Sequence, residues 1–314
     1  MINIDSKIYI AGHKGMVGSA CWKLLIKNGY KNLIGYSKER LDLTDQLAVD
    51  NFFKKEKPEI VINAAAKVGG IIANKNFPFD FLNENLQIQT NLINSANLYD
   101  VKKFIFLGSS CIYPKYCQQP IKEDYLLNGP LEPTNDSFAI AKIAGLKLCQ
   151  SIRKQLKKEF ITLMPTNLYG LNDTFHLENS HVIPSMIMKF HDAKINNLDE
   201  VLLWGTGDPL REFLHVDDLA EAIIAVLKSN ELSFDYYNIG SGEEISIKNL
   251  GLLIKEIVGF KGVIKWDKSK PDGTPRKFLD SSRINKLGWK AKKNLDSTIE
   301  EYYINFINSI NQNV

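Results

Sequence analysis

The chain has 314 residues, of which 44% are hydrophobic and 24% are charged, as in an ordinary globular protein of one large domain or two modest ones. Its net charge of +3 comes from interspersed charged residues without a long basic block, which argues against a nucleic-acid partner. The four cysteines show no CxxC spacing, and no apolar run approaches the roughly 18 residues that span a bilayer. The start runs directly into a strand without a leader pattern, so we expect a cytoplasmic protein with no membrane segment.

Short β-branched runs alternate with helical stretches through the first half of the chain. The strand-like runs are KIYIAG, NLIGYS, EIVINAAA and KFIFLGSS, and the helical ones between them include SACWKLLIKNG and FLNENLQIQTNLINSANLYD. Such alternation predicts an α/β fold with a doubly wound parallel sheet, the Rossmann arrangement. The strands show little polar alternation, as expected when helices cover both faces.

After FITLMPTNLYG the pattern changes. Residues 171–210 are rich in Asn, Asp and His, with one clear helical stretch at VIPSMIMKFH. We therefore expect residues 1–170 to form the nucleotide-binding domain, with 211–235 returning to it. Residues 171–210 and 236–314 should form a smaller substrate-binding lobe.

A glycine-rich turn follows the first strand and opens the next helix. In IYIAGHKGMVGSA the glycines form a GxxGxxG, which suits close approach to a dinucleotide diphosphate at a helix N-terminus. The same pattern can also serve only as a connection. We expect cofactor contacts here and at the ends of later strands, namely from Gly12, His13, Lys14, Gly15, Met16, Val17, Gly18, Asn63, Ala64, Ala65, Pro165, Asn167 and Leu168.

The end of the second strand bears on the choice between NAD and NADP. Ser37 occupies the position where an acidic residue would receive the ribose 2′-hydroxyl. Lys38 and Arg40, together with Lys14, offer cations for a 2′-phosphate, which favours NADPH. Alternatively, they are solvated surface charges. Asp42 is a candidate hydrogen-bond partner of the adenine.

Polar residues also end the strand KFIFLGSS. Ser109, Ser110 and Cys111 lie there, and ligands of open α/β sheets bind at the carboxyl ends of strands. About thirty residues later Lys142 follows Phe138 by one helical turn. These residues make this strand end a candidate catalytic site.

The sequence resembles the extended short-chain dehydrogenase/reductases and, more closely, the GDP-L-fucose synthases. These are NADPH-dependent 3,5-epimerase/4-reductases that act on GDP-4-keto-6-deoxymannose. The similarity extends over nearly the whole chain, through GHKGMVGSA, LGSSCIYPK, LEPTND, AIAKIAG, MPTNLYG, NSHVIP, WGTG, REFLHVDD, YYNIGSG and KPDGTPRK.

The resemblance implies that Ser109 binds the C-4 oxygen and that Lys142 holds the nicotinamide ribose and lowers the pKa of a neighbouring phenol. That phenol belongs to a tyrosine one turn before the lysine, where this chain has Phe138. A phenyl ring fills the same space but has no proton to give. We interpret Phe138 as an engineered, inactivating replacement; the alternative is a natural residue of a protein that uses another acid.

The resemblance also assigns the exchange of protons at C-3 and C-5 to Cys111 and His181, with His181 also near the cofactor. From the residues alone, Cys111 would be a buried small residue and His181 a loop histidine. The implied sugar-nucleotide partners are Asn167, Asn179, Lys189, Trp204, Arg211 and Asp272. Lys189 replaces the arginine typical of the family, and lysine keeps the charge but not the bidentate fork.

Two alternatives to an epimerase/reductase of GDP-4-keto-6-deoxymannose remain open from the sequence. The chain could be a C-4 reductase only, acting on a GDP-4-keto-heptose, or a non-catalytic NADP-binding sensor. We expect no metal site, since no His/Cys/Asp/Glu set has a convincing spacing. By analogy, we expect a homodimer through helices at about 82–99 and 138–157, with an apolar face that could equally be monomer core: Phe81, Leu86, Leu92, Ile93 and Ala96.

Overall fold

A parallel sheet of six strands forms the larger part of the protein. The computed structural model describes residues 3–173, 175 and 180–311. The strand order is β2-β1-β3-β4-β5-β9, with every neighbouring pair parallel, which confirms the predicted doubly wound fold. The strands are β1 (Ile8–Ala11), β2 (Leu33–Ile34), β3 (Ile60–Asn63), β4 (Lys103–Leu107), β5 (Glu159–Pro165) and β9 (Tyr236–Ile239).

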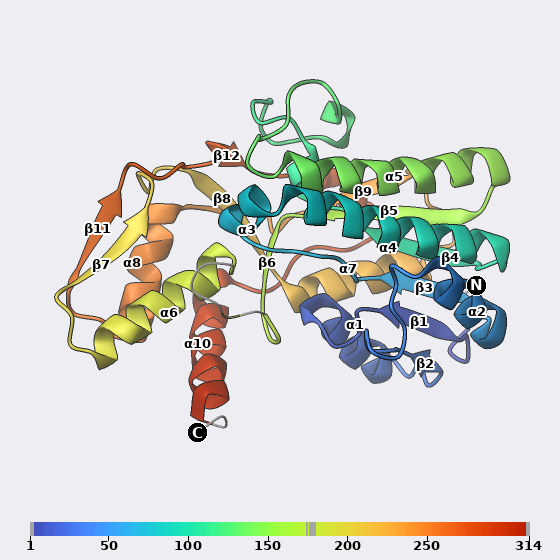
Figure 1. Ribbon diagram of the computed structural model, residues 1–314, viewed down its shortest axis with the longest axis horizontal. Helices are drawn as coiled ribbons and strands as arrows, with labels where there is room; N and C mark the ends of the chain where they lie inside the picture. Colours follow the sequence, from blue (N-terminus) through green and yellow to red (C-terminus); the bar gives the residue numbers. More distant parts are fainter. Residues whose placement is uncertain (1–2, 174, 176–179, 312–314) are drawn as a thin grey trace.

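Helices cover both faces of this sheet (Figure 1). Helices α1 (Met16–Lys27) and α7 (Val216–Lys228) pack together on one face. Helices α2 (Gln46–Glu56), α4 (Pro78–Leu98) and α5 (Asp136–Leu156) cover the other. The strand order reverses direction between β1 and β3, so the sheet has a switch point beside the carboxyl end of β1, where such folds bind ligands.

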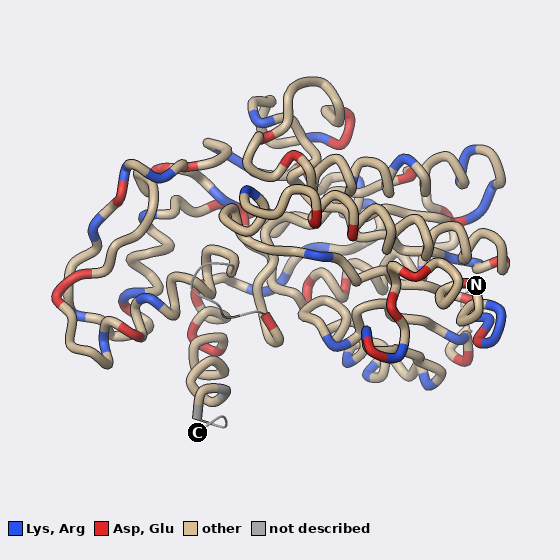
Figure 2. Tube along the Cα trace, viewed as in Figure 1, with Lys and Arg blue, Asp and Glu red and all other residues tan. Residues whose placement is uncertain are grey.

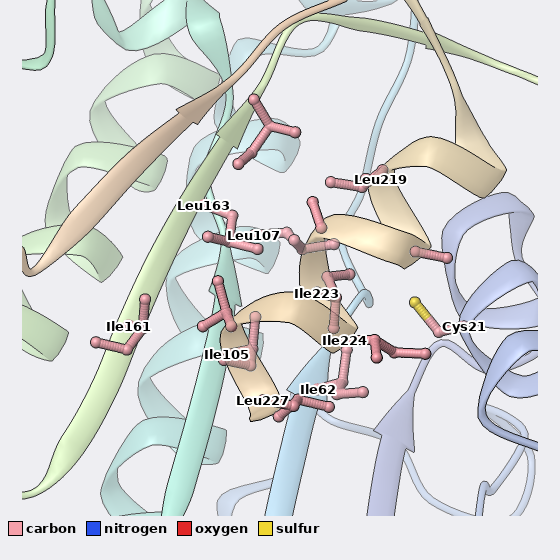
Figure 3. Packing of buried hydrophobic residues seen from close by; sticks show 14 of the residues in the cluster. Cys21, Ile62, Ile105, Leu107, Ile161, Leu163, Leu219, Ile223, Ile224 and Leu227 are labelled. Atoms are coloured by element: carbon pink, nitrogen blue, oxygen red, sulfur yellow. The ribbon is translucent and has the colours of Figure 1, made fainter. Parts of the chain in front are cut away.

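Successive residues of each strand enter different hydrophobic cores. In β1, Ile8 and Ile10 pack toward α1 and α7, while Tyr9 and Ala11 pack toward α2 and α4. Figure 3 shows the first of these cores, where side chains of β3, β4 and β5 meet those of α7 and α1. Because both faces are buried, the strands carry apolar residues at consecutive positions.

The second lobe has its own small sheets and core. Strand β8 (Leu210–His215) pairs with β6 (Asn167–Tyr169), β10 (Glu244–Ser246) and β12 (Arg276–Lys277), and β7 (Glu200–Trp204) pairs with β11 (Val263–Asp267). Helices α6 (Val182–Ile195), α8 (Ile247–Val258) and α10 (Leu295–Asn311) pack around a separate hydrophobic cluster. The short elements are α3 (Ile71–Asn76), α9 (Ser282–Asn285) and the 3-10 turns η1 (Ser110–Ile112) and η2 (Glu123–Tyr125).

Local sequence signals fix the ends of α8. Its N-cap is Ser246, whose hydroxyl accepts a hydrogen bond from the backbone N–H of Asn249 at 3.1 Å. The helix ends at Gly259, which has φ 75° and closes the left-handed turn that glycine favours.

The chain crosses between the two parts at different points from those expected. The sequence pattern places residues 236–239 in the smaller lobe, but they form β9, the outer strand of the six-stranded sheet beside β5. Conversely, residues 210–215 form β8 of the second lobe's sheet, although Leu214 of this strand and the following helix α7 are buried in the core of the larger part. Strand β9 belongs there because Tyr237 and Ile239 are buried among the side chains of β5 and α7.

The apolar face considered for a dimer belongs to the core of the monomer. Phe81, Leu92, Ile93 and Ala96 are all buried within the chain. They hold α4 against the sheet and against α5, with which it packs side by side. Any contact between two copies through these helices would therefore use their outer faces, where Phe79, Leu98 and Ile140 are exposed.

No helix of the described residues is long and apolar enough to cross a membrane. Figure 2 shows Lys and Arg interspersed with Asp and Glu along both parts of the chain, as the sequence suggested.

Candidate active site

The glycine loop has the close packing that its sequence predicts. Gly12 has φ 76°, and a Cβ there would lie 2.9 Å from the backbone nitrogen of Ala65. A Cβ on Gly18 would lie 2.1 Å from the carbonyl oxygen of Gly12. Glycine is therefore required at both positions. Gly12 allows its loop to contact the loop after β3, and Gly18 allows α1 to approach the backbone that follows β1.

The N-terminus of α1 remains available to an anion. Gly15 is the N-cap, no side chain caps the helix, and its first turn carries no acidic residue. Beside it, the side-chain nitrogen of Asn63 is buried and has no hydrogen-bond partner among the described residues, although its oxygen accepts from the Ala65 N–H at 3.2 Å. Unpaired donors beside a glycine cradle fit a dinucleotide diphosphate.

Other residues predicted for the cofactor line the same carboxyl edge. Ala64, Pro165 and Leu168 lie at the ends of β3 and β5 and in β6, while Met16 and Val17 begin α1 and are half-buried. His13 packs against Trp22, with ring centroids 5.6 Å apart. Burial, reinforced by the charge of Lys14, lowers the pKa of His13, which favours a neutral ring.

The predicted phosphate cations differ from one another in their surroundings. Lys14 and Lys38 are exposed, but both act on the carboxylate of Glu39, whose pKa is lowered first by a hydrogen bond from Ser37. Arg40 lies over the ring of Tyr36, 3.7 Å from its centroid, and donates a hydrogen bond to its hydroxyl at 3.0 Å. Glu39 and the stacking of Arg40 were not foreseen from the sequence.

The Asp42 carboxylate accepts hydrogen bonds within its own turn. One carboxylate oxygen accepts hydrogen bonds from the N–H and the hydroxyl of Thr44, at 2.9 and 2.8 Å, and these bonds lower the pKa of Asp42. The contact with an adenine stays a prediction.

The end of β4 carries the polar residues expected for catalysis. Ser109 is the N-cap of η1, and its hydroxyl oxygen accepts a hydrogen bond from the N–H of Cys111 at 3.3 Å. Ser110 and Cys111 are buried within η1. Burial raises the pKa of the Cys111 thiol, while Lys277, the Ser109 hydroxyl and Lys142 oppose that rise.

Lys142 joins α5 to the same strand end. It is buried, and its ammonium donates a hydrogen bond to the carbonyl oxygen of Leu107 at 2.9 Å. Its nitrogen lies 5.6 Å from the ring centroid of Phe138, one turn earlier on α5. Burial lowers the pKa of Lys142 to about 8. The structure therefore places Phe138, Lys142, Ser109 and Cys111 in one neighbourhood.

Lys277 lies beside the candidate site and was not foreseen from the sequence. Strand β12 pairs it directly with Arg211 of β8, and its charge acts on Cys111. Burial lowers the pKa of Lys277, and the neighbouring Cys111 opposes that shift. The segment KPDGTPRK drew attention to Asp272 alone, although its last residue was the available signal.

The predicted nucleotide residues gather at the edge of the second lobe. Trp204 ends β7 with 40% of its surface exposed. The Lys189 nitrogen lies 5.4 Å from a Trp204 ring centroid and donates to the carbonyl oxygen of Leu202 at 3.1 Å, and Lys270 lies 5.6 Å from the Trp204 ring. Burial lowers the pKa of Lys189.

Arg211 and Asp272 form the other half of this group. Arg211 donates a hydrogen bond to the backbone oxygen of Asp272 at 3.1 Å, and burial lowers its pKa to about 10. The Asp272 carboxylate accepts from the N–H and hydroxyl of Thr206 at 2.8 and 2.9 Å. A Cβ on Gly205 would lie 2.1 Å from Asp272, so glycine is needed beside Trp204 for this carboxylate to approach.

Three further residues predicted for the site lie in different surroundings. Asn167 begins β6, and its side chain donates to the carbonyl oxygen of Glu212 at 2.9 Å. His181 is the exposed N-cap of α6, and no hydrogen bond joins it to Ser109 or Cys111 in the described part of the chain. Asn179 lies outside the described residues. The described residues also contain no group of His, Cys, Asp and Glu able to hold a metal.

Comparison with known proteins places this geometry in a family. The model of the NAD dependent epimerase/dehydratase family matches residues 8–240. The chain belongs to this family.

Its relatives within the family are more specific. It is 54% identical to "Putative GDP-L-fucose synthase 2" of Arabidopsis thaliana, over 99% of this chain and 95% of the other. It is 47% identical to the GDP-L-fucose synthase of Escherichia coli, over 95% of each. Among solved structures, it resembles a GDP-mannoheptose C4 reductase from Campylobacter jejuni with NADP bound, at 40% identity and TM-score 0.88, covering 96% of this chain and 98% of the other. The resemblance to GDP-L-fucose synthases is thereby confirmed.

Proposed function

We propose that the chain is an NADPH-dependent enzyme that epimerises a GDP-4-keto-6-deoxymannose at C-3 and C-5. It carries the residues for reduction at C-4 except the proton donor, whose position holds Phe138. The observation that carries this proposal is the cluster of Ser109, Cys111, Lys142 and Lys277 at the carboxyl end of β4. The relatives that share 47–54% of the sequence are named as GDP-L-fucose synthases, which supports the same substrate class.

The cofactor is NADP(H), held at the glycine loop and the N-terminus of α1. The free donors of that terminus suit the diphosphate, and Asn63 offers a side-chain nitrogen beside it that has no partner among the described residues. Lys14 and Lys38 are the exposed cations for the 2′-phosphate. When bound, NADPH supplies the hydride for C-4. The NADP-bound relative at 40% identity supports this assignment.

Epimerisation needs a base and an acid near the carbons on either side of the keto group. We assign these roles to Cys111 and His181. Lys277 and Lys142 both favour the Cys111 thiolate. The thiolate would take the proton from C-3 or C-5, and His181 at the start of α6 would return one from the opposite face.

Reduction at C-4 is the step that this chain performs poorly. Ser109 hydrogen-bonds the keto oxygen, and the Lys142 ammonium stabilises charge that develops there. The remaining need is a proton donor, and the position one turn before Lys142 holds Phe138. The proposal is therefore an enzyme whose exchange chemistry persists while its reduction is slow.

The GDP part lies against the second lobe. Arg211 and Lys189 supply positive charge for the diphosphate, and the exposed ring of Trp204 offers a face for the guanine. Asp272 is fixed by Thr206 next to Gly205, the residue after Trp204, and is assigned to a ribose or base edge.

Two other functions are tested by the same experiment. The C. jejuni relative is named as a GDP-mannoheptose C4 reductase, so reduction without epimerisation of a GDP-4-keto-heptose is the second candidate. A non-catalytic NADP-binding sensor is the third. Incubation with GDP-4-keto-6-deoxymannose in deuterated water separates the epimerase from both, because only the epimerase introduces deuterium at C-3 and C-5.

A matched control uses Cys111→Ser, which keeps the size of the side chain but lacks a thiolate. The chain should label the sugar and the variant should not. Equal labelling by both would assign the exchange to another base. Failure of the chain to label either carbon would remove the epimerase proposal.

We also propose a homodimer through the outer faces of α4 and α5. The exposed side chains of Phe79, Leu98 and Ile140 would lie in or beside that contact. Light scattering at micromolar concentration should give twice the mass of 35.6 kDa, and a monomer mass would refute the dimer. Ile140→Lys should lower the dimer fraction, whereas the same change at the exposed Ile26 of α1 should not.

A further inference from the structure

The loop between β3 and α3 is fixed to α4 by several polar contacts. Asn85 accepts a hydrogen bond from the backbone N–H of Lys67 and donates one to its carbonyl oxygen, both at 3.0 Å. The Lys67 ammonium lies 2.5 Å from a carboxylate oxygen of Glu84 and 3.6 Å from one of Asp80. These contacts hold the loop beside the carboxyl edge of the sheet.

One side of this loop approaches the catalytic aromatic position. A Cβ on Gly69 would lie 3.1 Å from the ring of Phe81, so the loop backbone rests on that ring. Phe81 is buried and meets Phe138 edge to face, with centroids 6.3 Å apart. The loop is thus one aromatic ring away from the site of reduction.

The other side reaches the residues assigned to the diphosphate. A Cβ built on Gly273 would lie 3.5 Å from a guanidinium nitrogen of Arg211 and 3.9 Å from Cδ1 of Ile71. Ile71 and Arg211 therefore approach the same glycine from the two lobes. Figure 1 places α3, which begins at Ile71, where the two parts of the molecule meet.

Between these two ends the loop presents apolar side chains that are only partly covered. Ile71 has 38% of its surface exposed and Val68 has 60%. Asn74 holds the intervening backbone by donating hydrogen bonds to the carbonyl oxygens of Gly69 and Gly70 at 2.9 and 3.0 Å. Because the loop approaches Arg211 at one end and the ring beside Phe138 at the other, it lies near both ends of a sugar that joins a diphosphate at Arg211 to a keto group at Ser109.

We propose that Ile71, with Val68 beside it, forms the apolar wall against C-6 of the sugar and sets a preference for a 6-deoxy sugar over one with a C-6 hydroxyl. The proposal rests on the proposed function, since it assumes that a GDP-sugar occupies the site. A methyl group at C-6 packs against alkyl side chains, whereas a hydroxyl there loses hydrogen bonds to water without gaining a partner.

The test measures binding, which does not depend on the proton donor missing at Phe138. GDP-L-fucose and GDP-L-galactose have the same stereochemistry and differ by one hydroxyl at C-6. Their dissociation constants are measured by calorimetry in the presence of saturating NADP⁺. We expect the chain to favour GDP-L-fucose by roughly 10-fold, the scale of discrimination that one small group gives in an apolar pocket.

Ile71→Thr supplies a hydroxyl partner in a β-branched side chain that is one carbon shorter. It should reduce the preference to about threefold or less, while the affinity for GDP, which has no sugar, stays the same. Ile26→Thr changes an exposed isoleucine of α1 in the same way and should leave the preference unchanged. If Ile71→Thr loses GDP binding, Ile71→Val tests the same wall: it removes one methyl group, leaves room for water beside the C-6 hydroxyl and should also reduce the preference.

Equal affinities of the native chain for the two nucleotide sugars would overturn the proposal, as would an unchanged preference in both Ile71 variants. If the chain binds GDP and GDP-L-fucose but the Ile71 variants keep the same preference, the proposed function stands and only the role of Ile71 is refuted. Failure of the native chain to bind GDP or either GDP-sugar would instead remove the proposed function, and the assignment of this wall with it.

Discussion

Restoring a hydroxyl at position 138 should restore reduction. Phe138→Tyr adds one oxygen at the far end of a half-buried ring that lies beside Lys142. General acid catalysis by one side chain typically accelerates a reaction by roughly 10² to 10⁴-fold, about 3 to 5 kcal/mol of barrier. We expect the rate of NADPH oxidation with GDP-4-keto-6-deoxymannose to rise by that factor.

The surroundings of the ring suit the new phenol to this role. The Lys142 ammonium lies 5.6 Å from the ring centroid, so its charge would favour the phenolate and lower the pKa of the new phenol. Burial lowers the pKa of Lys142 itself to about 8, so the ammonium loses its proton as the pH rises through that value. Reduction by the variant should therefore decline above about pH 8.

The assay follows NADPH absorbance and deuterium incorporation side by side in the two proteins. Deuterium exchange should be similar in both, because it depends on Cys111 and His181. Affinity for NADPH should also change little, since the glycine loop and Lys142 are untouched. Equal rates of NADPH oxidation in the two proteins would show that Phe138 is not at the proton-donating position and would refute this reasoning.

Three further changes test other parts of the site. Gly18→Ala places a Cβ where only 2.1 Å separates it from the Gly12 oxygen, so NADPH affinity measured by fluorescence should fall at least about tenfold; unchanged affinity would exclude this loop. Lys277→Met removes a charge that lowers the pKa of Cys111, so the pH profile of deuterium exchange at saturating substrate should move to higher pH. If the thiol pKa rises by about one, exchange at neutral pH should slow by roughly tenfold. An unchanged profile would contradict the assignment of Cys111 as the base. Burial raises the pKa of Glu212 to about 7, so the folded state holds its proton more tightly than the unfolded state does. The unfolding free energy should therefore fall by up to about 3 kcal/mol as the pH rises from about 4.5 to 7. Urea titrations of Glu212→Gln should lack this pH-dependent fall, and its persistence in the variant would show that Glu212 does not cause it.

The parts of the site that the sequence predicted depend on local signals. The glycine loop is read from a strand, three glycines and a helix within a dozen residues, and the structure has that order at Gly12 and Gly18. Ser109 and Cys111 follow a continuous apolar strand, so their position at the carboxyl end of β4 is also local information. Lys142 is placed by its spacing from Phe138 on one helix.

The missed features depend on pairing between distant segments. Lys277 lies in a strand of two residues, and only its register with Arg211 brings it beside the site. Strand β9 carries a polar residue, Asn238, which is completely buried. Its amide accepts from the hydroxyl of Tyr113 at 2.6 Å and donates to the carbonyl oxygen of Ile121 at 2.8 Å. No window around β9 contains those partners, so its place in the main sheet was not readable.

Arg40 is a different kind of omission. It lies four residues after Tyr36, in a turn where its guanidinium stacks on the ring. Arginine often lies over the face of a tyrosine ring, and these two residues are close in the chain. The phosphate prediction treated Arg40 only as a charge, and its stacking determines where that charge is held.

Labelling in deuterated water tests the central claim most directly. The chain is mixed with GDP-4-keto-6-deoxymannose without NADPH, and the recovered sugar is examined by mass spectrometry and proton NMR. An epimerase acting through Cys111 and His181 should replace hydrogen with deuterium at both C-3 and C-5, and Cys111→Ser should not. A recovered sugar with no deuterium at either carbon would contradict the account.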